Sequence, residues 1–155
     1  MTKFFSFIFT FIFTVFITIS SSVAISKNLL IVGDSLSAGY NMPIEQSWPV
    51  LLNQKYQQDN LPVTVINASI SGDTTGNGLE RLPNLLAQHN PDYLLIALGA
   101  NDGLRGFSTN IISDNLTQMI TLSQSKSVQV LLMQIKIPQI TENAITNYLR
   151  IFIPI

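Results

Sequence analysis

Four short apolar runs recur along the chain, and polar or glycine-containing sequence bounds each of them. They cover residues 28–32, 61–68, 93–99 and 128–135. Each run is continuous rather than alternating, which is typical of strands buried on both faces of a parallel sheet. The pattern therefore predicts four strands.

Apolar residues at helical spacing fill the intervals between these runs. Segment 47–58 begins with Ser47 as a candidate N-cap and has Pro49 in its first turn, where the missing N–H costs nothing. Segment 78–89 contains Pro83, which we expect to restart the helix, and segment 108–126 has Ser108 or Thr109 as its cap. The predicted apolar faces consist of Trp48, Leu51, Leu52 and Tyr56; of Leu79, Leu82, Leu85 and Leu86; and of Ile112, Leu116, Met119 and Ile120.

Strands that alternate with helices at this spacing predict right-handed βαβ units and a three-layer α/β sandwich with a parallel sheet. The 155 residues suit a single domain. Lys and Arg number 8 against 9 for Asp and Glu, so there is no basic surface for phosphates and we expect no nucleic-acid partner. Cysteine is absent, which excludes a disulfide framework and a thiolate metal site.

The N-terminal sequence has the pattern of a secretory signal peptide. Lys3 precedes an apolar stretch at residues 4–19, and Ser22-Val23-Ala24 gives a small-x-small cleavage site. We expect residues 1–24 to be removed, which leaves no stable membrane span and a periplasmic or secreted protein. An uncleaved anchor is the alternative, but the apolar stretch is short for a span of about 20 residues and threonines dilute it.

Three of the predicted strands end in segments that carry candidate chemistry: "GDSLSAGY", "NASISGDTTGNG" and "LGANDGLRG". Ligands of open α/β sheets bind beyond the carboxyl ends of the strands, so the three segments are expected at one edge. Ser35 offers a hydroxyl, Gly72 a backbone N–H that no Cβ obstructs, and Asn101 an amide donor. Taken singly, each is an ordinary turn or cap residue. Their combination at three successive strand ends predicts an acyl-transfer site with an oxyanion hole.

These segments resemble the first three conserved blocks of the SGNH or GDSL hydrolases. The resemblance covers residues 29–138 and is nearest to the bacterial periplasmic arylesterase, acyl-CoA thioesterase I and lysophospholipase L1 subgroup. It implies a flavodoxin-like α/β/α sheet and a monomer that needs no cofactor or metal. It implies Ser35 as the nucleophile, with the Ser35 and Gly72 N–H groups and the Asn101 amide as oxyanion donors. Asp34 is expected to orient the turn, and Asp73 and Asp102 to cap loops.

The activating base of the family is a histidine in a C-terminal Asp-x-x-His block, and this chain departs from that pattern. Its one histidine, His89, is expected at the amino end of the sheet, opposite Ser35, where it suits the last turn of a helix. Residues 139–155 contain no Asp and no His. We therefore interpret 25–138 as an incomplete hydrolase domain without its fifth strand and last helix, followed by a frame-shifted or truncated tail.

Two readings of function follow. The first is a serine hydrolase of small acyl esters or thioesters by lineage, inactive as this fragment because a hydroxyl without a base is a weak nucleophile. The second is a non-catalytic remnant or a domain that binds acyl or glycan ligands at the same edge. A flavodoxin-like nucleotide binder is disfavoured, because "GDSLSAGY" has neither a P-loop ending nor a G-x-G-x-x-G pattern.

Overall fold

A computed structural model describes residues 26–134; residues 1–25 and 135–155, and with them the predicted signal peptide and tail, lie outside that range. Four strands form one sheet: β1 (Lys27–Gly33), β2 (Val63–Asn67), β3 (Tyr93–Ala97) and β4 (Gln129–Leu132). Their order is β2-β1-β3-β4, and every neighbouring pair is parallel. The predicted parallel sheet is confirmed. β1 extends one residue beyond its predicted run at each end, and the other three strands lie inside their predicted runs but are shorter.

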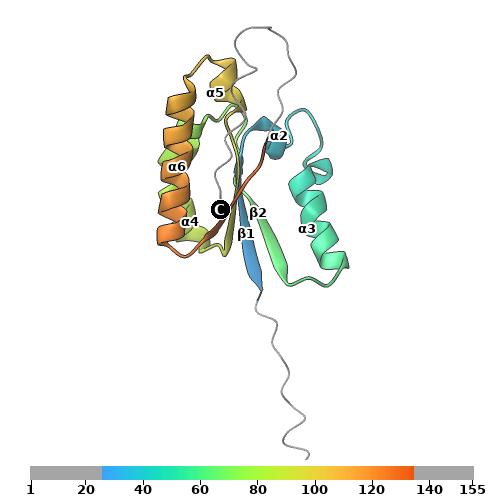
Figure 1. Ribbon diagram of the computed structural model, residues 1–155. Helices are drawn as coiled ribbons and strands as arrows, with labels where there is room; N and C mark the ends of the chain where they lie inside the picture. Colours follow the sequence, from blue (N-terminus) through green and yellow to red (C-terminus); the bar gives the residue numbers. More distant parts are fainter. Residues whose placement is uncertain (1–25, 135–155) are drawn as a thin grey trace, which may run out of the picture.

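Helices cover both faces of this sheet (Figure 1). α3 (Trp48–Gln58) packs against β2 on one face, while α4 (Thr75–His89) and α6 (Thr109–Ser125) pack together on the other. Three short helical turns complete the set: α2 (Ser35–Ala38), η1 (Ile44–Gln46) and α5 (Ala100–Leu104). This is the predicted three-layer sandwich, and its strand order is that of flavodoxin-like sheets.

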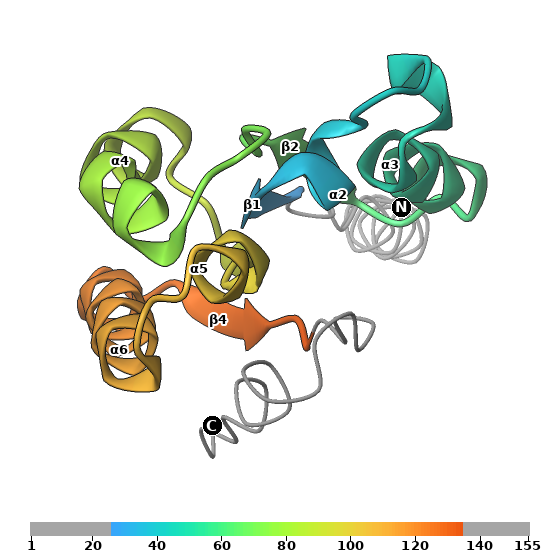
Figure 2. The same ribbon diagram turned by 90° about the horizontal axis from the view of Figure 1, so that it is seen from above.

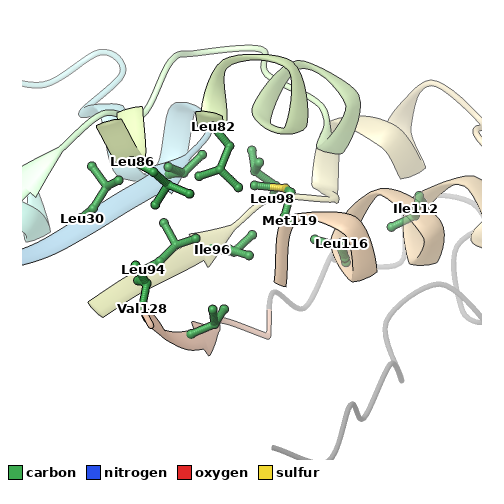
Figure 3. Packing of buried hydrophobic residues seen from close by; sticks show 12 residues of the cluster. Leu30, Leu82, Leu86, Leu94, Ile96, Leu98, Ile112, Leu116, Met119 and Val128 are labelled. Carbon is green, nitrogen blue, oxygen red and sulfur yellow. The ribbon is translucent and has the colours of Figure 1, made fainter. Parts of the chain in front are cut away.

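The main core lies between the sheet and the pair α4 and α6 (Figure 3). Gly78 lets α4 approach the sheet closely, because a Cβ at this position would overlap the Leu98 side chain. The buried core consists of Leu30, Val32, Leu82, Leu86, Leu94, Ile96, Leu98, Ile112, Leu116, Met119, Val128 and Val130. Three residues of the predicted α6 stripe are in this set, and the Ser108 hydroxyl caps α6 by accepting the Ile111 N–H, so Ser108 and not Thr109 is the cap.

The prediction that Pro83 restarts a helix is wrong, because α4 runs through it without a break. A proline inside a helix removes one backbone hydrogen bond and crowds the preceding turn, at a cost of roughly 3 kcal/mol. Leu82 and Leu86 are buried on the two sides of Pro83 and pack into the core. Burial of these flanking leucines offsets the cost and keeps the two turns in line.

Two details of α3 also differ from expectation. Ser47 is the N-cap residue, but its hydroxyl donates to the Ile44 carbonyl oxygen at 2.7 Å and accepts nothing from the helix. Leu51, predicted on the apolar face, is 50 % exposed. The reason is that α3 packs mainly against one edge strand, β2, which covers only a narrow stripe of the helix.

β4 and β2 form the two edges of the sheet within the described residues. The expectation that all strands are buried on both faces fails at these edges, since Leu131 of β4 is 45 % exposed. β1, an inner strand, is buried from Leu29 to Gly33 as the continuous apolar pattern predicts. Between residues 26 and 134, no helix is long and apolar enough to cross a membrane.

Candidate active site

The polar segments that follow β1, β2 and β3 lie at one edge of the sheet, because the three strands are parallel. Figure 2 looks down on this edge, where α2 and α5 lie over the strand ends. The Ile70 N–H donates to the Gly33 carbonyl oxygen at 3.0 Å, and the Asn67 amide donates to the Ser37 carbonyl oxygen at 2.7 Å. These bonds join the segment after β2 to the segment after β1.

Ser35 is the first residue of α2 and is partly exposed at this edge. The preceding Asp34 is buried, and its Oδ1 accepts the Leu36 N–H at 3.0 Å as the N-cap of the short helix. The expectation that Asp34 orients the turn is confirmed. The Asp34 carboxylate therefore fixes the turn through a hydrogen bond, while Ser35 remains partly exposed to solvent.

Gly72 lies in the loop between β2 and α4 with φ at +87°, a conformation that favours glycine. A Cβ at this position would meet no atom nearer than Arg105 Nη2 at 3.8 Å, so the backbone conformation and not lack of space requires glycine. The Gly72 carbonyl oxygen accepts a hydrogen bond from Arg105 Nη2 at 2.9 Å. This bond links the loop after β2 to the segment after β3.

Asn101, the second residue of α5, bonds to the segments that carry the other two candidates. Its Nδ2 donates to the Asp73 carbonyl oxygen at 2.9 Å and lies 3.4 Å from Asp34 Oδ2. The first contact fixes the amide, while the second is too long for a strong hydrogen bond. Because an amide nitrogen has two N–H groups, the second can serve another acceptor.

Asp102 and Asp73 were both expected to cap loops, and the structure agrees for Asp102 only. Asp102 is fully buried, and its carboxylate accepts the Thr75 N–H at 2.8 Å and the Thr75 hydroxyl. The Thr75 hydroxyl oxygen also accepts from Asn115 Nδ2 at 3.0 Å, so α5 is tied to α4 and α6. Asp73 pairs with Arg81 instead of capping a loop.

His89 is the last residue of α4, and β3 begins at Tyr93. It therefore lies at the amino edge of the sheet, opposite Ser35, as predicted. The chain has no other histidine. Within residues 26–134, no group of three or more His, Cys, Asp or Glu side chains could hold a metal ion.

Residues 31–151 match the family model described as the GDSL-like Lipase/Acylhydrolase family. The chain belongs to this family. It is 58% identical over 120 residues to an arylesterase from Vibrio mimicus, and the match covers 77% of this chain and 60% of the relative. It is 50% identical over 115 residues to "Thioesterase 1/protease 1/lysophospholipase L1" from Escherichia coli, with 74% of this chain and 54% of the relative covered.

A solved esterase structure agrees with the fold. The esterase EstA from Pseudoalteromonas sp., inhibited by monoethylphosphonate, gives a TM-score of 0.72 at 45% identity, covering 74% of this chain and 63% of that one. The chain thus spans less than two thirds of each of these three relatives. The family resemblance of the three motifs is confirmed, while the roles of Ser35, Gly72 and Asn101 remain predictions.

Burial raises the pKa of the Asp34 carboxyl above its ordinary value. The hydrogen bond from the Leu36 N–H lowers this pKa, and the neighbouring Asp73 and Asp102 carboxylates raise it further. The stabilisation that follows from a raised carboxyl pKa is fully present below the unfolded-state pKa and is lost as pH rises through the folded-state pKa. Asp34→Asn keeps a capping oxygen and removes the charge. We expect the free energy of unfolding of this variant, relative to the unchanged chain, to increase as pH rises from about 3 to about 7.

Urea unfolding across that pH range measures the difference. Asp114→Asn, on the exposed side of α6, is the control for losing one negative charge. If the difference in free energy of unfolding between Asp34→Asn and the unchanged chain stayed constant with pH, the pKa of Asp34 would not be raised by burial.

The sequence analysis did not single out Arg81, Arg105 or Thr75, which bond to the site segments. Arg81 offered one signal, because it lies eight residues after Asp73, and a spacing of seven or eight residues places side chains on the same side of a helix. Arg105 and Thr75 offered none, since their partners come from other segments of the chain.

Proposed function

We propose that this chain supplies the nucleophile and the oxyanion donors of a serine hydrolase that cleaves carboxylic esters and thioesters through an acyl-enzyme. Ser35 Oγ attacks the acyl carbonyl carbon and gives up its proton, and the oxyanion is bound by the Ser35 and Gly72 N–H groups and the Asn101 amide. The alcohol or thiol leaves with that proton, which the histidine of an Asp-x-x-His segment would transfer, and water then releases the acid from the acyl-enzyme. The observation that carries this proposal is the position of Asn101 Nδ2, 2.9 Å from the Asp73 carbonyl oxygen and 3.4 Å from Asp34. Asn101 therefore lies beside Asp34, which precedes Ser35, and beside Asp73, which follows Gly72.

The proposed substrate is a small acyl ester or thioester. Exposed apolar side chains follow each of the three strand ends, and such a surface favours the apolar part of an acyl group over water. They are Leu36, Tyr40, Met42, Ile44, Ile70, Leu104, Phe107 and Ile111. The names arylesterase and thioesterase of the relatives support the same substrate class.

A non-catalytic domain that binds acyl or glycan ligands at this edge is the second candidate. The position of His89 favours it, because the one histidine of the chain lies away from Ser35. Hydrolysis of a short p-nitrophenyl ester and of a matching thioester separates the two. A rate that depends on Ser35 supports the hydrolase. Ligand binding without such a rate, even after an Asp-x-x-His segment is joined to residues 1–138, favours the binding domain.

We infer that residues 1–24 are a secretory signal peptide, which leaves residues 25–138 as the hydrolase domain of a periplasmic or secreted monomer. Lys3, the apolar residues 4–19 and the Ser22-Val23-Ala24 site support this inference. N-terminal sequencing of the exported protein is expected to begin at Ile25. Recovery of intact Met1 in the membrane fraction would show an anchor instead.

A further inference from the structure

Arg81, in the second turn of α4, contacts both ends of the loop that contains Gly72. This loop, residues 68–74, joins β2 to α4. Arg81 Nη1 donates to the Ala68 carbonyl oxygen at the start of the loop, and Arg81 Nε donates to Asp73 Oδ2 near its end at 2.9 Å. One guanidinium group therefore joins the first residue of the loop to a residue near its end.

The Arg81–Asp73 pair is largely enclosed. The two side chains are 21% and 11% exposed, and Arg81 Nη2 also lies 2.8 Å from Asp73 Oδ2. That nitrogen is buried and makes no hydrogen bond of acceptable geometry with the described residues, so the directional contacts are those of Nε and Nη1. Partly buried pairs are screened less than surface pairs, and the rigid guanidinium fork sets the geometry of both acceptors together.

Asp73 connects this pair to two of the three predicted oxyanion donors. It directly follows Gly72 in the chain, so the position of Asp73 restrains the Gly72 peptide. Its carbonyl oxygen accepts the Asn101 amide at 2.9 Å, so the position of Asp73 also restrains Asn101. A displacement of Asp73 would therefore move both donors.

We propose that Arg81 is a positioning residue that holds the Gly72 and Asn101 donors in place through Asp73. The inference rests on the proposed function, because it concerns the same oxyanion site. The hydrogen bonds of Arg81 go to Ala68 and Asp73, so it acts by fixing the two ends of a seven-residue loop. Misplacement of catalytic groups by about 1 Å costs roughly 10²-fold in rate.

The deciding experiment measures the mobility of the Gly72 N–H by ¹⁵N relaxation in the full chain. Four proteins are compared: the unchanged chain, Arg81→Gln, Arg81→Lys and Lys55→Gln. The last is the matched control, since it removes an exposed cation that pairs with Asp59 on a helix away from the site. We expect a Gly72 order parameter of about 0.85 in the unchanged chain and in Lys55→Gln, and below about 0.6 in Arg81→Gln.

Arg81→Lys keeps the charge but cannot reach both acceptors with a fixed fork, so an intermediate order parameter is expected. Hydrolysis of p-nitrophenyl acetate gives a second readout: in a protein that joins residues 1–138 to an Asp-x-x-His segment, Arg81→Gln should lower kcat about 10²-fold with little change in KM. A folded Arg81→Gln protein with a rigid Gly72 would overturn the inference. Loss of the fold in both Arg81 variants would also overturn it, by making Arg81 a residue needed for stability alone.

Ser35→Ala in the protein joined to an Asp-x-x-His segment distinguishes this inference from the proposed function. Hydrolysis that survives Ser35→Ala rejects the hydrolase proposal and leaves the Gly72 measurement to decide on Arg81. Loss of hydrolysis in Ser35→Ala together with a rigid Gly72 in Arg81→Gln rejects the Arg81 inference and leaves the hydrolase proposal standing.

Discussion

Ser35→Ala is expected to lower kcat by about 10⁶-fold once residues 1–138 of this chain are joined to a family segment that carries Asp-x-x-His. That loss is the one seen when the serine of a complete protease triad is removed, because no other group forms the acyl-enzyme. Ser35 is the partly exposed residue in the capped turn after β1, where the joined histidine can activate it. The 155-residue chain by itself is expected to hydrolyse esters negligibly, since its only histidine is His89. Initial rates with p-nitrophenyl butyrate measure both effects.

His89→Ala is the control for this experiment, because His89 lies at the amino edge of the sheet at the end of α4. It should leave kcat of the joined protein unchanged. If the 155-residue chain were fully active and His89→Ala abolished that activity, the assignment of His89 to a structural role would be wrong. A joined protein in which Ser35→Ala retains full kcat would exclude Ser35 as the nucleophile.

Asn101→Ala is expected to lower kcat of the same joined protein by about 10²–10³-fold, the usual loss when one oxyanion donor is removed. The Asp73 carbonyl oxygen holds the Asn101 amide in place at 2.9 Å, so this donor is oriented before substrate arrives. A donor that acts only on the developing negative charge affects kcat and kcat/KM equally and leaves KM nearly unchanged. Steady-state kinetics with p-nitrophenyl butyrate separates these parameters.

Asn110→Ala removes an exposed amide from the first turn of α6 and serves as the matched control. Thermal unfolding of both variants checks that Asn101→Ala remains folded after losing its bond to Asp73. A loss of kcat in Asn101→Ala no larger than in Asn110→Ala would remove Asn101 from the oxyanion site.

Most of the fold was predictable because its signals are local. The runs that became β1 and β3 are apolar over consecutive residues, and the stripe of α6 repeats at helical spacing, so burial follows from a few neighbouring positions. The common edge of the three motifs followed as well, since the carboxyl ends of neighbouring parallel strands meet there. Two of the failures concern Pro83 and Leu51, where packing against distant elements decides whether a helix continues or which of its faces is covered.

The sequence by itself determined the order of strands and helices, the three motifs at strand ends, the family and the presence of a single histidine. Only the tertiary structure decided which groups bond across the edge: Asn101 reaches Asp34 over 67 positions of sequence, and Arg105 reaches Gly72 over 33. The tertiary structure also decided that Arg81 bonds to both ends of the loop that contains Gly72. The physical reason is range, because periodicity and turn chemistry act within a few residues, whereas the partner of a polar side chain depends on how whole elements pack.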